Sequence, residues 1–165
     1  MNVFLDMDGV LVDLARGFKN ITGYPLSWGL EKKIGKQKYW NPIHEARPNF
    51  WSGLPKMDGA DVMVESIVGH VSLDKVHILS AVFNDHEECE DEKRIWVADN
   101  TPIQSQNVNI VQRREKRDYA TSNGVPNILV DDMEKNCVEW VEAGGISILH
   151  TCPVSTVETL AEILN

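Results

Sequence analysis

The stretch NVFLDMDGVLVD, residues 2 to 13, places three acidic side chains inside an otherwise apolar run. Residues 3 to 5 have the length and hydrophobicity of a buried strand, and Asp6 and Asp8 follow at its end. Carboxylates spaced i, i+2 on an extended chain point to the same side, so both can face one cleft. A divalent cation makes such a pair tolerable, and the stretch therefore predicts a metal-dependent site.

Five apolar runs of strand length alternate with segments whose apolar residues have helical spacing. The runs are residues 3–5, 76–79, 108–111, 128–130 and 146–149. The helical segments are residues 60–71, about 87–97, about 115–122 with Gly124 as the stop, 133–143, and a C-terminal segment that opens with the capping-box spacing Ser155-x-x-Glu158. Such alternation predicts an α/β fold, a Rossmann-like parallel five-stranded sheet with helices on both faces.

Polar side chains follow four of these strands. They are Asp6 and Asp8 after the first, Ser80 after the second, Lys116 shortly after the third, and Asp131-Asp132 after the fourth. Because ligands of parallel sheets bind at the carboxyl ends of the strands, we expect these groups to meet at one edge.

Residues 14–56 interrupt the alternation, since they are far longer than an ordinary loop. Seven of the twelve aromatic residues lie here: Phe18, Tyr24, Trp28, Tyr39, Trp40, Phe50 and Trp51. We predict a small helical cap over residues 14–56, inserted after strand one, and a catalytic core of residues 1–13 and 57–165. Hinges are expected near Asp13 and Pro55.

The polar groups predict phosphate chemistry. Asp6 is ionised at neutral pH and can attack a phosphate to give an aspartyl-phosphate, while Asp8 can act as the acid and base. Gly9 permits a tight turn that can direct backbone N–H groups to the phosphate. Ser80 can donate to a phosphate oxygen, and Lys116 can neutralise developing charge.

Mg²⁺ is the expected cofactor, because it prefers a few oxygen ligands together with water and substrate phosphate. Asp6, the backbone carbonyl of Asp8 and one of Asp131 and Asp132 would supply these oxygens. The DxDG pattern also resembles the start of a calcium loop. That pattern requires polar residues where residues 10–12 are apolar, so calcium is the weaker interpretation.

Composition narrows the class of protein. The 165 residues are 42% hydrophobic and carry a formal net charge of −9, which disfavours binding to long nucleic acid. No apolar run is long enough for a membrane span and no leader precedes the first strand, so a cytoplasmic protein without membrane contact is expected. Three scattered cysteines indicate neither disulfides nor zinc. The oligomeric state, monomer or homodimer, is left open.

The motifs DMDGVLVD (6–13), HILSA (77–81), REKRD (114–118) and ILVDDME (128–134) resemble, in order and spacing, those of the haloacid dehalogenase superfamily phosphatases. The resemblance implies that Asp6 is the nucleophile and Asp8 the acid and base. It also implies that Asp131-Asp132 is the metal-binding pair. Asp132 is then the direct ligand and Asp131 bonds Lys116.

The segment KYWNPIHEARPNFWSGLPKMDGA (38–60) is similar to the caps of the 5′(3′)-deoxyribonucleotidases. In those enzymes an aromatic pair, matched by Tyr39 and Trp40, lines the nucleoside pocket. Stacking of a base on such rings is worth about 1–3 kcal/mol. The alternative is that both rings form the core of the cap. Ala81, beside Ser80, completes the expected substrate-binding set.

The resemblance implies a Mg²⁺-dependent phosphomonoesterase of the 5′-nucleotidase type, acting on (deoxy)nucleoside monophosphates. The alternatives are a polynucleotide 3′-phosphatase, another small-molecule phosphatase of this superfamily, and a non-catalytic phosphate-binding regulatory module.

Overall fold

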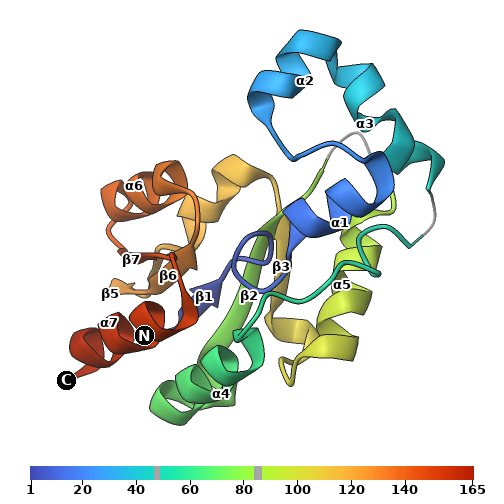
Figure 1. Ribbon diagram of the computed structural model, residues 1–165. Helices are drawn as coiled ribbons and strands as arrows, with labels where there is room; N and C mark the ends of the chain where they lie inside the picture. The colour runs from blue at the N-terminus through green and yellow to red at the C-terminus, as the bar shows by residue number, and fades with distance from the viewer. Residues whose placement is uncertain (47–48, 84–86) are drawn as a thin grey trace.

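The computed structural model describes residues 1–46, 49–83 and 87–165. Five parallel strands form its central sheet in the order β3-β2-β1-β6-β7 (Figure 1). Their bounds are β1 Val3–Leu5, β2 Val76–Ala81, β3 Val108–Val111, β6 Ile128–Asp131 and β7 Ile146–Leu149. The α/β fold with a parallel five-stranded sheet is therefore confirmed.

The α-helices occupy the connections between the strands. They are α1 Leu14–Thr22, α2 Trp28–Ile34, α3 Lys36–Glu45, α4 Ala60–Val71, α5 Cys89–Asn100, α6 Glu134–Glu142 and α7 Pro153–Leu164. Three 3-10 helices, η1 Leu73–Lys75, η2 Ser105–Asn107 and η3 Arg113–Tyr119, and a hairpin of β4 Thr121–Ser122 with β5 Val125–Pro126 complete the described elements.

The two faces of the sheet pack against different helices, because successive strand residues point to opposite sides. Val3 and Leu5 belong to the larger apolar cluster, which contains residues of α4, α5 and α7. Phe4, between them, belongs to a second cluster with Leu129 and with Trp140 of α6. Strand β1 is thus buried on both faces, which holds the residues after Leu5 in fixed positions.

Helices α1, α2 and α3 stand together beyond the end of the sheet at which β1 ends (Figure 1). The chain leaves the core and returns to it side by side, since the N–H of Asp13 donates to the carbonyl of Pro55 at 2.8 Å. The N–H of Met57 likewise donates to the carbonyl of Leu11 at 2.8 Å. The carboxyl ends of the strands therefore face the segment that the sequence predicts to be a cap.

Two local predictions are wrong. The helix expected over residues 115–122 is the 3-10 helix η3 followed by the β4–β5 hairpin. Asn123 and Gly124 both have positive φ, 52° and 77°, as a two-residue hairpin turn requires, so Gly124 does not stop a helix. Helix α7 begins at Pro153 rather than at Ser155, because proline is well suited to the first helical position.

Within the described part of the chain, every helix is too short or too polar to cross a membrane.

Candidate active site

Asp6 lies in a buried ion-pair cluster at the end of β1. Its Oδ2 is 3.0 Å from the ammonium of Lys116, which is also 2.7 Å from Oδ2 of Asp131. Its Oδ1 accepts a hydrogen bond from the N–H of Met7 at 2.7 Å. Burial alone would lower the pKa of Lys116, but the charges of Asp6 and Asp131 outweigh it and the pKa is raised. Lys116 therefore stays cationic beside Asp6.

Asp8 is held by a lysine that the sequence analysis missed. The ammonium of Lys93, in α5, donates to Oδ2 of Asp8 at 2.6 Å, to Oγ of Ser80 at 2.9 Å and to the carbonyl of Ala81 at 2.8 Å. Lys93 is only 1% exposed. A lysine that is buried in the first turns of a helix belongs to no sequence motif. The one available signal was its helical spacing from the apolar residues of the same helix.

One oxygen of Asp8 is available for chemistry. Its Oδ1 is buried and has no hydrogen-bond partner among the described residues. Buried polar atoms are normally paired, so an unpaired carboxylate oxygen in a cleft marks a place where a ligand group can bind. Ser80, which is fully buried, accepts from Lys93 and keeps its own O–H to donate.

The acidic pair after β6 has two different environments. Asp131 is fully buried and accepts hydrogen bonds from Lys116, from the N–H of Met133 and from the amide of Asn136. Burial, together with the charge of Asp6, raises its pKa even so. Asp132 is exposed, and partial burial of its carboxyl and the nearby charge of Asp6 raise its pKa to about 7.

A metal ion would satisfy this arrangement. Carboxylate oxygens of Asp6, Asp131 and Asp132 lie within 4.8 Å of one another. Three clustered carboxylates with one lysine among them leave excess negative charge, which adds to the effect of burial in raising the pKa of Asp132. Hard oxygen donors of this kind fit Mg²⁺. The side chain of Asp8 lies outside this group, since Lys93 holds it.

Gly9 makes room for Asp132. It has φ +82°, and a Cβ built on it would lie 2.2 Å from Oδ2 of Asp132. The expectation that its turn directs N–H groups at a phosphate is not met at residues 9–12. The N–H of Gly9 donates to the carbonyl of Val12, and those of residues 10–12 donate to the carbonyl of Met7.

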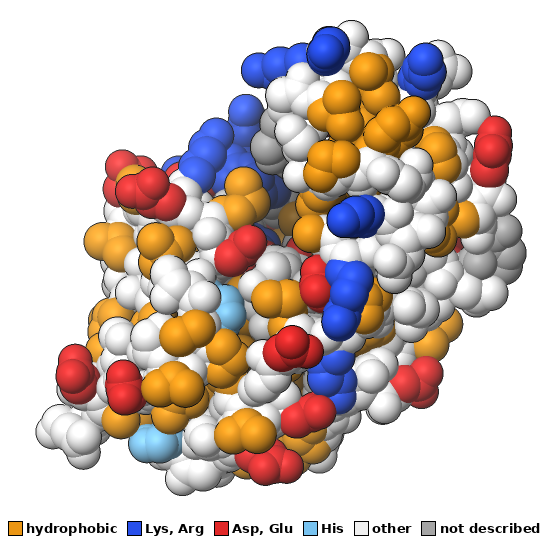
Figure 2. Space-filling view, viewed as in Figure 1, with side chains coloured by type: hydrophobic (Ala, Val, Ile, Leu, Met, Phe, Trp, Pro, Cys, Tyr) orange, Lys and Arg blue, Asp and Glu red, His pale blue; other side chains and the backbone are white. Residues whose placement is uncertain are grey.

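A hollow opens between the segment of α1–α3 and the core, and Lys and Arg side chains gather on one rim of it (Figure 2). The rim corresponds to η3, in which Arg114 and Arg117 are exposed and Arg113 pairs with Glu139 at 2.8 Å. A protein of net charge −9 thus carries local positive charge beside its carboxylate cluster. This charge favours an anionic ligand.

Tyr39 and Trp40 both lie in the apolar interior of the α1–α3 segment. The hydroxyl of Tyr39 accepts from the N–H of Ser27 at 2.6 Å and donates to the carbonyl of Pro25 at 2.8 Å. Trp40 packs against Phe83, which follows β2, with 4.5 Å between ring centroids. Its indole N–H is buried without a hydrogen-bond partner among the described residues. The two rings therefore differ, because only Trp40 has an unsatisfied polar atom.

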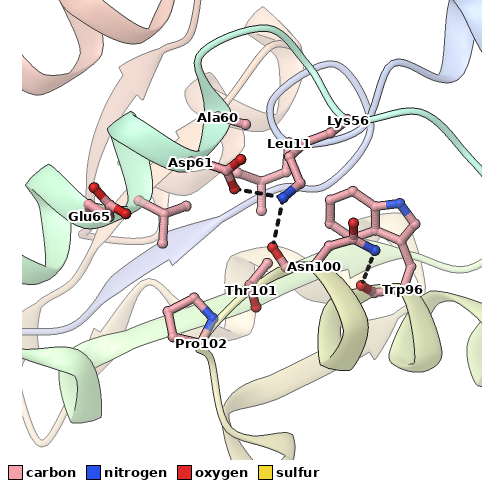
Figure 3. A pocket seen from close by; sticks show the side chains of 10 residues that line it. Leu11, Lys56, Ala60, Asp61, Glu65, Trp96, Asn100, Thr101 and Pro102 are labelled. Carbon is pink, nitrogen blue, oxygen red and sulfur yellow. Dashed lines mark hydrogen bonds and ion pairs between the residues drawn. The ribbon is translucent and has the colours of Figure 1, made fainter.

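A separate cavity of about 240 Å³ lies between the loop after β1, helix α4 and the end of α5 (Figure 3). Leu11, Val64 and Trp96 line it, together with an ion pair of 2.6 Å between Lys56 and Asp61. None of the carboxylates at the ends of β1 and β6 lines it. It is therefore distinct from the candidate active site.

No protein-family model and no curated protein sequence matches the chain. Solved structures do. A haloacid dehalogenase family hydrolase from Deinococcus radiodurans R1, with bound phosphate and sodium, is 14% identical with a TM-score of 0.56 over 96% of this chain and 87% of that one. A haloacid dehalogenase-like hydrolase from Streptococcus pneumoniae is 13% identical with a TM-score of 0.52 over 88% and 82%.

A haloacid dehalogenase family enzyme from Bacteroides thetaiotaomicron is 16% identical with a TM-score of 0.50 over 91% of this chain and 93% of that one. The similarity spans both the sheet and the segment between β1 and α4. The chain therefore has the fold of the haloacid dehalogenase family hydrolases.

Proposed function

We propose that the protein is a Mg²⁺-dependent phosphomonoesterase that works through a phospho-Asp6 intermediate. The observation that carries the proposal is the meeting of Asp6, Asp8 and Ser80 with two buried lysines at the carboxyl ends of β1, β2 and β6. The phosphate and sodium bound by the similar hydrolase from Deinococcus radiodurans support it further.

The chemistry assigns a role to each of these groups. A carboxylate oxygen of Asp6 attacks phosphorus, and the bond from phosphorus to the ester oxygen breaks. Asp8 gives a proton to that leaving oxygen from Oδ1, which no described residue binds, and later takes a proton from the water that hydrolyses phospho-Asp6. Lys116 and the hydroxyl of Ser80 stabilise the charge on the phosphoryl oxygens.

Asp6 and Asp132 would hold the magnesium ion, with the backbone carbonyl of Asp8 as the third protein ligand. The ion would offset the repulsion between these carboxylates and an anionic phosphate. Asp131, which is occupied by Lys116 and Asn136, would orient Lys116.

The substrates that we propose are (deoxy)nucleoside monophosphates, recognised by the segment 14–56. Trp40 supports this choice, because its buried indole N–H has no partner in the described part of the chain and can donate to a polar group of a base. Its contact with Phe83 joins it to the strand end that carries Ser80. Tyr39, whose hydroxyl is already hydrogen-bonded within the segment, would hold Trp40 in place.

Phosphate release from a panel of nucleoside 5′- and 3′-monophosphates, sugar phosphates and an oligonucleotide 3′-phosphate tests the proposal. We expect release from mononucleotides that requires Mg²⁺ and is absent in Asp6→Asn. Release from the oligonucleotide alone would identify a polynucleotide 3′-phosphatase. Binding of Mg²⁺ and nucleotide with no release from any ester would identify a non-catalytic module.

A further inference from the structure

The cap returns to the core through residues 49–56, here called the return segment, and a buried carboxylate binds its first half. Glu92 accepts hydrogen bonds from the N–H groups of Asn49 at 2.7 Å, Trp51 at 2.7 Å and Ser52 at 3.3 Å. The side chain of Glu92 is buried, with 5% exposure. Hydrogen bonds to an ionised group are stronger than neutral ones, so Glu92 fixes the path of this backbone.

The second half of the return segment is attached to the same helix. The indole N–H of Trp96 donates to the carbonyl of Leu54 at 2.8 Å. The ammonium of Lys56 donates to the carbonyl of Asn100 at 3.0 Å (Figure 3). Residues 92, 96 and 100 are spaced by four, so one face of α5 holds the return segment over three consecutive turns.

Lys93, next to Glu92, connects this attachment to Asp8. The ring of Trp51 lies 5.1 Å from the ammonium of Lys93, close enough for a cation–π interaction. The same ammonium is 2.6 Å from Oδ2 of Asp8. Glu92 places Trp51, Trp51 covers Lys93, and Lys93 holds Asp8.

We propose that Glu92 is a positioning residue for Asp8, acting through Trp51 and Lys93; this inference rests on the proposed phosphatase function. Loss of the Glu92 charge frees the backbone at residues 49–52 and withdraws the ring of Trp51 from Lys93. Water then reaches the ammonium, and Asp8 is no longer confined to one orientation. The defect falls on proton transfer to the leaving group, since Asp6 and Lys116 are held by other contacts.

Two esters distinguish positioning from simple support of the fold. An alkyl phosphate, such as a nucleoside 5′-monophosphate, needs a proton on its leaving oxygen, whereas 4-nitrophenolate leaves without one. We expect Glu92→Gln to lower kcat/KM on the alkyl ester about tenfold and on 4-nitrophenyl phosphate less than about twofold. This ratio reports the steps up to phosphorylation of Asp6 and excludes the later hydrolysis of phospho-Asp6, in which Asp8 is the base. Glu90→Gln is the matched control, because Glu90 lies on the exposed side of α5 and pairs only with Arg94 among the described contacts. It should change neither rate.

A folded Glu92→Gln protein whose kcat/KM falls equally on both esters, or on neither, overturns the inference. If Glu92→Gln does not fold, as judged by circular dichroism, Trp51→Leu tests the same link, because it keeps the backbone N–H groups that Glu92 binds. For Trp51→Leu as well, a loss on the alkyl ester alone supports the inference, and an equal loss on both esters or on neither contradicts it. A wild-type protein that hydrolyses neither ester refutes the proposed function, and the positioning role with it.

Discussion

The ammonium of Lys93 lies 2.6 Å from Oδ2 of Asp8, while Oδ1 of the same carboxylate has no partner among the described residues. One oxygen is held by the protein and the other is available to a leaving group. Asp6 is held in the same way by Lys116 at 3.0 Å, so each aspartate of the DMDG motif has its own buried lysine.

Replacing Lys93 by methionine should lower kcat on a nucleoside monophosphate about 100-fold. The change removes the contact that orients Asp8 and one donor to Ser80. It also leaves the partly buried Asp8 carboxylate without its ion-pair partner, so Tm should fall. Steady-state kinetics and thermal unfolding measure both effects. Lys75→Met is the control, because Lys75 is half-exposed and lies 4.0 Å from its partner Asp74; equal losses in both variants would contradict the role of Lys93.

Gly9→Ala should weaken Mg²⁺ binding about tenfold or more, because the new methyl group displaces the carboxylate of Asp132. The positive φ adds a backbone cost of about 1–2 kcal/mol to the free energy of folding. Gly23→Ala separates the two effects, since Gly23 has φ +71° and no atom within 4 Å of a built Cβ. Mg²⁺ titration calorimetry should show a change for Gly9→Ala alone. Unchanged Mg²⁺ affinity there would argue against Asp132 as a ligand.

The raised pKa of Asp132 predicts how metal and pH affect stability. The folded, metal-free protein binds a proton at this carboxyl up to about pH 7, whereas the unfolded chain releases it near the ordinary aspartate pKa of 3.8. The contribution of Asp132 to the free energy of unfolding is therefore full below pH 3.8 and is lost as the pH rises to 7. Without metal, Asp132→Asn should raise Tm relative to wild type at pH 7.5 more than at pH 5.

With Mg²⁺ present, the wild type should instead have the higher Tm at pH 7.5, since the ion replaces the proton as the partner of the Asp132 carboxylate. The increase in Tm on adding Mg²⁺ to the wild type should be larger at pH 7.5 than at pH 5, and small in Asp132→Asn. Equal increases in both proteins would place the bound ion elsewhere.

The sequence predicted the sheet and its strands, because strand-length apolar runs depend on local pattern alone. It also predicted that the polar residues after these strands meet, because the rule for parallel strand ends needs only the strands themselves. These residues are Asp6, Asp8, Ser80, Lys116 and Asp131-Asp132. Lys93 was missed because its role depends on which face of α5 turns inward. That face contacts the return segment, which lies about 40 residues away in the sequence.

The hairpin of β4 and β5 carried a local signal that was misread. Asn123-Gly124 is the preferred turn of a two-residue hairpin, but the basic and acidic residues before it have helical spacing. The short η3 accommodates both the helical spacing and the hairpin turn, since its 3-10 turns end before the hairpin begins. Lys116 reaches Asp6 from this η3, so the error in secondary structure left the predicted residue unchanged.

Trp40 and Tyr39 should respond differently to substitution. Trp40→Phe keeps an aromatic ring and removes the indole N–H, for which the described residues supply no partner. KM for a nucleoside monophosphate should therefore rise about three- to tenfold, while KM for 4-nitrophenyl phosphate stays constant. Tyr39→Phe removes the hydroxyl that binds Ser27 and Pro25, which should lower the free energy of unfolding by about 1 kcal/mol and leave KM unchanged. A nucleotide KM that responds only to Tyr39→Phe would reverse this assignment.

The covalent intermediate is the most direct test of the account. Wild-type protein mixed with Mg²⁺ and a nucleoside monophosphate, quenched in acid within one turnover and digested, should yield the peptide containing residues 2–13 with one added phosphoryl group. Reduction with borohydride should convert position 6 to homoserine, which identifies the acyl phosphate. Asp6→Asn should give no such peptide, and Asp8→Asn should form it more slowly. A protein that releases phosphate at its normal rate with residue 6 never phosphorylated would contradict the proposed mechanism.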